Sequence, residues 1–211
     1  MLEARKTVVK VNKEKTYNYY ISFPKNESSK KLPLIVFLHG FDERGDNVEK
    51  VKIHGLPKLF DVDNDYECIT VSPQCPGDSI WPAEIVTLKQ FIDEIIEEYN
   101  IDKNRVYLTG ISMGGYGTWY TAQTYPDFFA AIAPVCGGGM SWYAGVLKMP
   151  VWAFHGAVDS VVSVEESKNM VREINNTGGN AKITIFENVD HDSWNYAYTD
   201  ELMKWLLEQS K

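Results

Sequence analysis

Short apolar runs alternate with amphipathic helical patterns from about residue 32 onward, and this alternation constrains the fold more than any other feature of the chain. Helices between strands provide crossover connections, which make neighbouring strands parallel and cover both faces of a sheet. The runs expected to form buried strands are Leu34–Leu38, Cys68–Val71, Arg105–Leu108, Ala130–Ala133, Val151–Phe154 and Lys182–Phe186. The pattern therefore predicts an α/β fold with a mostly parallel sheet and helices on both faces.

The beginning of the chain has a different pattern. Thr7–Val11 and Tyr17–Ile21 are apolar-rich segments that flank the polar Asn12–Lys15. This arrangement predicts a hairpin at an antiparallel edge of the sheet. Together with the six runs above, the hairpin gives an expected sheet of eight strands.

Three helices are marked by spacing and by capping residues. Apolar residues at steps of three and four predict a helix from Ile85 to Tyr99 that covers one face of the sheet. Ser163 and Glu166 have the spacing of a capping box, which predicts a helix that begins there and continues through about Asn175. A last helix is expected to bury a stripe formed by Trp194, Tyr198, Leu202 and Trp205.

Length and charge bound the possible functions. The chain has 211 residues, 44% hydrophobic and 24% charged, which suffices for one sizeable core and predicts a single domain over residues 1–211. Its net charge of -8 disfavours nucleic acid and anionic membranes as partners, because both attract clustered basic residues.

No segment suggests membrane insertion or export. The chain has no apolar run of about 18 residues, and Met1–Lys6 lacks the apolar core of a signal peptide. The sequence as given therefore predicts a cytoplasmic location, while a removed leader would leave no trace in it. The oligomeric state stays open.

The three cysteines do not predict a metal site. Cys68, Cys75 and Cys136 lie in or just after expected strands, at spacings that match no common zinc site. We expect buried free thiols.

The stretch TGISMGGYG, Thr109–Gly117, places Ser112 directly after an expected strand. In alternating α/β sheets this position is a sharp turn at the carboxyl edge, where ligands collect. A nucleophile on such a turn has a strained backbone that crowds its second neighbours, so Gly110 and Gly114 fit a nucleophile elbow. The alternative is that Ser112 merely caps a helix after a glycine-rich turn.

A serine nucleophile needs a base and an acid that orients the base. His191 follows the last expected strand, and Asp159 follows the strand before it. The resulting order Ser112, Asp159, His191 is the order of α/β-hydrolases, with each residue in a loop at the same sheet edge.

The other histidines and acids are weaker candidates. His39 and His155 each end a strand before a glycine, where a histidine more often bonds loop backbone, and His54 is expected at the surface or at a helix end. Asp190 and Asp192 flank His191 and are rivals to Asp159. Immediate neighbours point away from an imidazole more often than they reach its Nδ1, which favours Asp159.

Two backbone amides are candidates for the oxyanion hole. One belongs to Met113, directly after Ser112, and the other to Phe41, in the loop after Leu34–Leu38. Both side chains could equally line the pocket.

At this point the sequence resembles the α/β-hydrolase superfamily, and within it small esterases similar to family-one carbohydrate esterases, polyhydroxybutyrate-depolymerase-like proteins and predicted peptidases. The match extends over nearly the whole chain. It is carried by Leu38–Gly45, by Ser72–Pro76 with Trp81, by Gly110–Gly115, by His155, Gly156 and Asp159, and by His191 and Asp192.

The resemblance implies an eight-stranded sheet, a Ser112–Asp159–His191 triad and no cofactor. It also suggests that Glu43 and Arg44 fix the oxyanion loop, the alternative being a solvated ion pair. No insertion long enough for a large lid is present.

The expected function is that of a serine carboxylesterase acting on small-molecule esters. The alternatives on the same triad are a peptidase and a thioesterase, and the alternative of another class is a non-catalytic binding protein with this fold. Trp81, Trp142 and Trp194 follow strand ends and are expected to gather at the catalytic edge as substrate-binding residues, favouring short or aromatic acyl groups. Packing under loops is the alternative for these tryptophans, above all for Trp194.

Overall fold

The sheet determines where every candidate residue lies. The computed structural model describes residues 15–25, 30–60 and 66–211. Seven strands in this part of the chain form one sheet in the order β1-β3-β2-β4-β5-β6-β7. Their bounds are β1 (Tyr19–Ser22), β2 (Leu32–Leu38), β3 (Ile69–Pro73), β4 (Ile101–Ile111), β5 (Ala131–Val135), β6 (Val151–Gly156) and β7 (Ala181–Phe186).

The pairing is mostly parallel, as the sequence predicts. β1 pairs antiparallel with β3, placing Tyr19 opposite Pro73, and every other neighbouring pair is parallel. β1 therefore forms the expected antiparallel edge, but the strand expected at Thr7–Val11 lies outside the described residues. The fold class is that of an α/β-hydrolase, with seven described strands where eight were expected.

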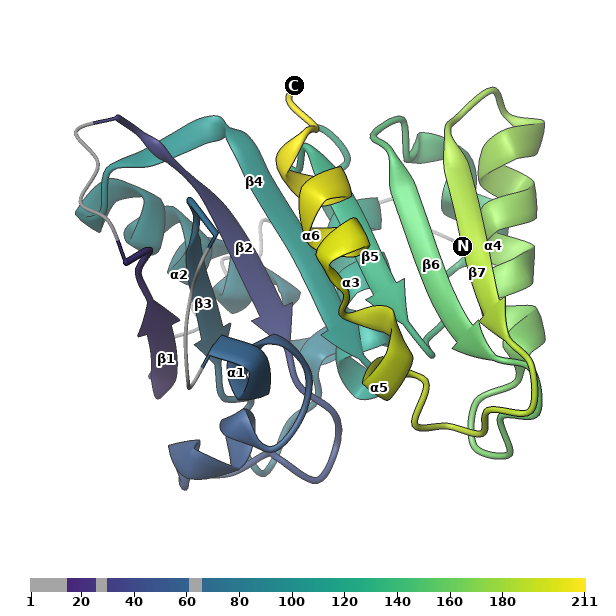
Figure 1. Ribbon diagram of the computed structural model, residues 1–211, viewed down its shortest axis with the longest axis horizontal. Coiled ribbons are helices and arrows are strands. Elements are labelled where there is room, and N and C mark those ends of the chain that lie inside the picture. Colours follow the sequence, from purple (N-terminus) through teal and green to yellow (C-terminus); the bar gives the residue numbers. More distant parts are fainter. Residues whose placement is uncertain (1–14, 26–29, 61–65) are drawn as a thin grey trace, which may run out of the picture.

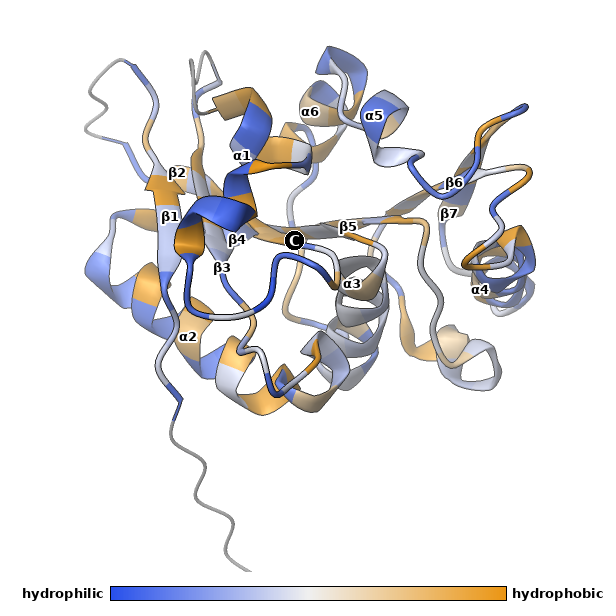
Figure 2. Ribbon diagram, turned by 90° about the horizontal axis from the view of Figure 1, so that it is seen from below, coloured by the Kyte–Doolittle hydropathy of each residue, from blue (hydrophilic) through white to orange (hydrophobic). Residues whose placement is uncertain are grey.

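Helices cover both faces of the sheet. Figures 1 and 2 show α2, α3 and α4 on one face and α1, α5 and α6 on the other. The helices, including the short 3-10 turns η1 to η3, are η1 (Val48–Lys52), α1 (Gly55–Phe60), η2 (Trp81–Ala83), α2 (Ile85–Glu98), α3 (Met113–Thr124), η3 (Ser141–Val146), α4 (Val164–Asn176), α5 (Trp194–Ala197) and α6 (Asp200–Leu207).

The side chains of β2 show why helices cover both faces of the sheet. Leu34, Val36 and Leu38 point into the core beneath α2, α3 and α4. Ile35 and Phe37 point into the core on the opposite face. Such a strand is apolar at every position because neither of its faces meets water.

Two of the three expected helices form as predicted. α2 occupies the expected segment, and α4 begins after Ser163, whose Oγ accepts a hydrogen bond from the Glu165 amide at 3.3 Å. The prediction of one continuous last helix was wrong. The chain breaks after Ala197, and the Thr199 hydroxyl caps a new helix by accepting from the Leu202 amide at 3.4 Å.

The parallel strands direct their carboxyl ends to one edge of the sheet (Figure 1). The loops after β2, β4, β6 and β7 carry the candidate residues to this edge. Within the described ranges, no helix is long and apolar enough to cross a membrane.

Candidate active site

Ser112 lies at a strained turn between β4 and α3. Its φ of 52° and ψ of -114° are outside the regions that residues with a side chain usually adopt. A Cβ at Gly114 would lie 1.9 Å from the Leu38 carbonyl oxygen, and one at Gly110 would lie 2.5 Å from the Gly114 oxygen. The two glycines therefore allow the turn to press against the end of β2, as a nucleophile elbow requires.

The structure brings together the three residues that the sequence singles out. The Ser112 hydroxyl lies 2.8 Å from His191 Nε2, and His191 Nδ1 lies 2.9 Å from Asp159 Oδ2 and 3.1 Å from Oδ1. The His191 side chain is 18% exposed, whereas that of Asp159 is fully buried. This geometry suits proton transfer from Ser112 to Nε2, with the carboxylate holding the proton of His191 on Nδ1.

Several donors surround the Asp159 carboxylate besides His191. The amides of Val161 and Val162 donate to Oδ1 at 2.9 and 2.8 Å, and His155 Nε2 lies 3.3 Å from Oδ2. These contacts compensate the burial of the carboxylate and fix its plane.

The rival acids make other contacts. Asp190 Oδ1 accepts from the amide and hydroxyl of Ser160 and from the His191 amide, and these bonds lower the pKa of Asp190. Asp192 accepts from Asn195 Nδ2 at 3.0 Å. Neither carboxylate is bonded to the His191 ring in the described structure, so the geometry favours Asp159.

His39 and His155 bond to loop backbone, as expected. His39 Nδ1 lies 2.6 Å from the Gly40 oxygen, and His155 Nε2 lies 2.9 Å from the Val162 oxygen. Burial lowers the pKa of His39 to about 4 and also lowers that of His155. Both rings are therefore neutral at physiological pH.

The loop after β2 carries Phe41, whose amide is the second one predicted for the oxyanion hole. Phe41 and Met113 both line the same pocket as Ser112. Arg44 Nε donates to the Phe41 carbonyl at 2.9 Å, and its guanidinium stacks on the Phe41 ring at 3.3 Å. Arg44 thus holds the loop after β2, while the buried carboxyl of Glu43 lies 3.8 Å from His39 Nδ1 and 3.7 Å from His54 Nε2.

A pocket of about 880 Å³ opens above Ser112. Apolar and aromatic side chains form much of its wall, and several of them are exposed at the surface, Val161 by 69%. Polar side chains, among them those of Glu43 and His54, also line the pocket. The residues that line the pocket are Gly40, Phe41, Asp42, Glu43, Lys50, Ile53, His54, Ile80, Pro82, Ile111, Ser112, Met113, Tyr116, Tyr120, Val161, His191 and Trp194.

Sequence reasoning missed two parts of this wall. Ile53 and His54 come from the segment between η1 and α1, which is too short to produce a periodic pattern. Tyr116 and Tyr120 stand one helical turn apart on α3, a spacing of four that could have marked them as one face above Ser112.

The expectation that three tryptophans bind substrate was wrong for Trp81. This side chain is 0% exposed, packs against Gly117 in the core, and donates from Nε1 to the His39 carbonyl at 3.0 Å. Trp81 comes after the end of β3, but its ring turns into the core. Gly117 of α3 has no side chain at this contact and leaves room for the indole.

Trp142 is also not part of the pocket wall. Its side chain is 80% exposed on η3, and the described residues that line the pocket do not include it. The preceding chain runs along α3 away from its Ser112 end, because Gly137 lies against Gly115 and Gly139 against Trp119. Trp194 does line the pocket, with its ring 5.4 Å from that of His191.

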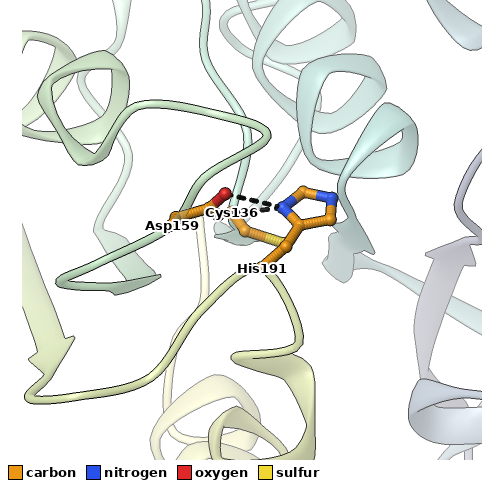
Figure 3. Close-up of side chains that lie close together, drawn as sticks. All are labelled: Cys136, Asp159 and His191. Carbon is orange, nitrogen blue, oxygen red and sulfur yellow. Dashed lines mark hydrogen bonds and ion pairs between the residues drawn. The ribbon is translucent and has the colours of Figure 1, made fainter.

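One group of potential metal ligands lies within the site. Ligand atoms of Cys136, Asp159 and His191 lie within 4.8 Å of one another (Figure 3). The Asp159 and His191 atoms are hydrogen-bonded to each other. Burial raises the pKa of the Cys136 thiol to about 12, so the sulfur is protonated and a weak ligand. Cys68, Cys75 and Cys136 are all buried free thiols, as expected.

Comparison with known proteins finds a depolymerase and an acetylxylan esterase among the relatives of this chain. The chain is 35% identical over 115 residues to poly(3-hydroxyalkanoate) depolymerase C of Paucimonas lemoignei, covering 50% of this chain and 28% of that protein. It is 32% identical over 147 residues to the bifunctional acetylxylan esterase/xylanase XynS20E of Neocallimastix patriciarum, covering 66% of this chain and 21% of that protein. The chain thus spans less than a third of either relative.

A solved structure of a thermostable esterase is similar over more of the chain. It superposes with a TM-score of 0.80 at 33% identity, covering 92% of this chain and 59% of the esterase. The model of the phospholipase/carboxylesterase family matches residues 65–204, which include the segments that carry Ser112, Asp159 and His191. The chain belongs to the phospholipase/carboxylesterase family.

Proposed function

We propose that this protein is a serine carboxylesterase in which Ser112 is the nucleophile, His191 the general base and Asp159 the residue that orients the base. The observation that carries the proposal is the continuous hydrogen-bonded chain from the Ser112 hydroxyl through both nitrogens of His191 to the buried Asp159 carboxylate. A non-catalytic protein with this fold would have no need to keep Ser112 in a strained conformation.

The reaction proceeds in two steps. Ser112 Oγ attacks the ester carbonyl carbon while His191 Nε2 takes the hydroxyl proton, and the Phe41 and Met113 amides stabilise the oxyanion. Collapse of the tetrahedral intermediate expels the alcohol, which receives the proton from His191. Water then attacks the acyl-enzyme with His191 again as base, releasing the acid and restoring Ser112.

The pocket supports esters with short or aromatic acyl groups on small or carbohydrate alcohols. Phe41, Ile80 and Trp194 provide apolar contact area, and the carboxyl of Glu43 and the imidazole of His54 provide a polar wall. The name of one relative, an acetylxylan esterase, is consistent with a short acyl group on a carbohydrate alcohol.

The test combines labelling with a substrate panel. A fluorophosphonate should add to Ser112, as mapped by peptide mass spectrometry, and should abolish turnover of nitrophenyl acetate. The panel compares nitrophenyl acetate, butyrate and dodecanoate, methyl ferulate, acetylated xylo-oligosaccharides, an acyl thioester and an aminoacyl amide. We expect the highest kcat/KM with short or aromatic oxygen esters.

Ser112→Ala should remove activity without changing the thermal unfolding midpoint, and Ser141→Ala, on η3 outside the pocket, should retain it. Label on another serine would refute the proposed nucleophile. A higher kcat/KM for the amide or the thioester would replace the carboxylesterase with a peptidase or a thioesterase.

A further inference from the structure

We propose that His39 is a positioning residue of the oxyanion hole, whose Nδ1–H fixes the Gly40–Phe41 peptide group so that the Phe41 amide faces the pocket. The inference rests on the proposed function, since it concerns the amide expected to bind the oxyanion. It assigns a task to a histidine that takes no part in the proton transfers.

The tautomer of His39 follows from its partners. The backbone amide of Cys75 donates to His39 Nε2 at 2.9 Å, so Nε2 must carry a lone pair and no proton. The ring proton is therefore on Nδ1. Nδ1 lies 2.6 Å from the Gly40 carbonyl oxygen, to which it donates.

This carbonyl belongs to the peptide group that ends in the Phe41 amide. A trans peptide is planar, with its C=O and N–H directed oppositely, so a bond that fixes the oxygen also fixes the direction of the N–H. With its oxygen turned toward His39, the group directs the Phe41 N–H away from His39. No backbone carbonyl in the described residues accepts from this N–H, and Phe41 lines the pocket with Ser112.

The surroundings hold His39 itself in place. Trp81 Nε1 donates to the His39 carbonyl at 3.0 Å, and the indole meets the imidazole edge to face at 5.2 Å. The ring is buried, which lowers the pKa of His39 to about 4. The Glu43 carboxylate at 3.8 Å from Nδ1 and the nearby Arg44 are the charged groups on its side of the loop. The neutral tautomer is thus the state that the fold selects.

A matched pair of variants separates the two bonds of His39. In His39→Asn the side-chain amide nitrogen overlays Nδ1, so the donor to Gly40 is kept and the acceptor for Cys75 is lost. In His39→Gln the side-chain oxygen overlays Nε2, so the acceptor is kept and the donor is lost. Both are assayed for kcat and KM with nitrophenyl acetate, and for inhibition by a trifluoromethyl ketone, whose hemiketal forms an oxyanion.

We expect His39→Gln to lose about 10²- to 10³-fold in kcat, the loss typical of one oxyanion donor, with little change in KM. Affinity for the trifluoromethyl ketone should fall in parallel. His39→Asn should lose less than about tenfold, because the Gly40 carbonyl keeps its donor. Equal losses in the two variants, or a larger loss in His39→Asn, would overturn the proposal.

A measurement on the unaltered protein does not depend on how the variants fold. In protein labelled with ¹⁵N-histidine, the ring nitrogens of His39 should show the Nδ1–H tautomer and remain neutral at pH 6. A proton found on Nε2 would overturn the inference even if the enzyme is active. Absence of ester hydrolysis and of Ser112 labelling in the same preparation would instead refute the proposed function, leaving the tautomer result to decide the role of His39 in the loop.

Discussion

The Asp159 carboxylate is bonded from several directions, and this distinguishes it from the two acids beside His191. Its two oxygens accept hydrogen bonds from His191 Nδ1 and from the amides of Val161 and Val162. His155 Nε2 lies 3.3 Å from Oδ2. These contacts hold the buried carboxylate in one orientation against the His191 ring. In the proposed mechanism, a carboxylate held in this position keeps the proton of His191 on Nδ1 and leaves Nε2 to act as the base.

Asp159→Asn should therefore lower kcat with nitrophenyl acetate by about 10³- to 10⁴-fold, because an amide no longer enforces the tautomer. Asp192→Asn should change kcat by less than about threefold, since Asp192 bonds only Asn195 among the contacts of its side chain described here. Asp190→Asn should lose less than about tenfold, through weaker anchoring of the loop at Ser160.

Steady-state kinetics of the three variants test this order, with circular dichroism as a check on folding. A loss in Asp190→Asn or Asp192→Asn larger than that in Asp159→Asn would assign the acid to one of the neighbours of His191.

At the scale of elements, the end of β2 and the first turn of α3 form one unit. A Cβ at Gly114 would lie 1.9 Å from the Leu38 carbonyl oxygen and 2.7 Å from that of His39. The helix that starts after Ser112 is therefore in direct backbone contact with the strand that leads into the loop of Phe41. The contact fixes the start of α3 against the end of β2, where the loop with the proposed oxyanion amide of Phe41 begins.

Gly114→Ala should destabilise the protein by about 3 kcal/mol or more, because neither backbone can move without breaking sheet or helix hydrogen bonds. Gly77→Ala is the control, since its Cβ would meet its nearest atom, Gly45 Cα, at an ordinary 3.5 Å. Urea denaturation of both variants gives the two free energies of unfolding. Similar losses for the two would show that the close approach at Gly114 relaxes easily.

The strands, helices and loops differ in how far the sequence predicts them. Strand positions and the meeting of Ser112, Asp159 and His191 follow from local apolar runs, because a parallel sheet gathers its carboxyl ends at one edge. No comparable local pattern in the sequence indicates whether the side chain of a loop residue points into the core or toward solvent. Trp81 turns into the core because Gly117, far along the chain, leaves space for it, and the last helix breaks where Thr199 offers a cap.

At the scale of the whole molecule, two buried histidines contact the loops that form the site. His39 bonds the loop that carries the Phe41 amide, and His155 lies against Asp159. Burial lowers the pKa of both below that of a free histidine, and for His39 it lowers the pKa to about 4. The arrangement couples folding to pH.

The stability of the protein should consequently fall as the pH falls from about 6.5 to about 4. The pKa of His39 is 6.5 as a free side chain and about 4 in the fold, so between these values the unfolded chain binds a proton that the folded protein does not. Unfolding is then favoured by acid, by up to about 3 kcal/mol for His39 alone, and the effect vanishes above the unfolded pKa.

His39→Asn has no titrating group at this position, and groups shared by both proteins cancel in the comparison. The difference in unfolding free energy between wild type and His39→Asn, measured by urea denaturation from pH 7 to pH 4.5, should therefore shift against the wild type as the pH is lowered. A difference that stays constant over this range would mean that His39 takes up its proton in the fold as readily as in the unfolded chain, and would contradict its burial as a neutral ring.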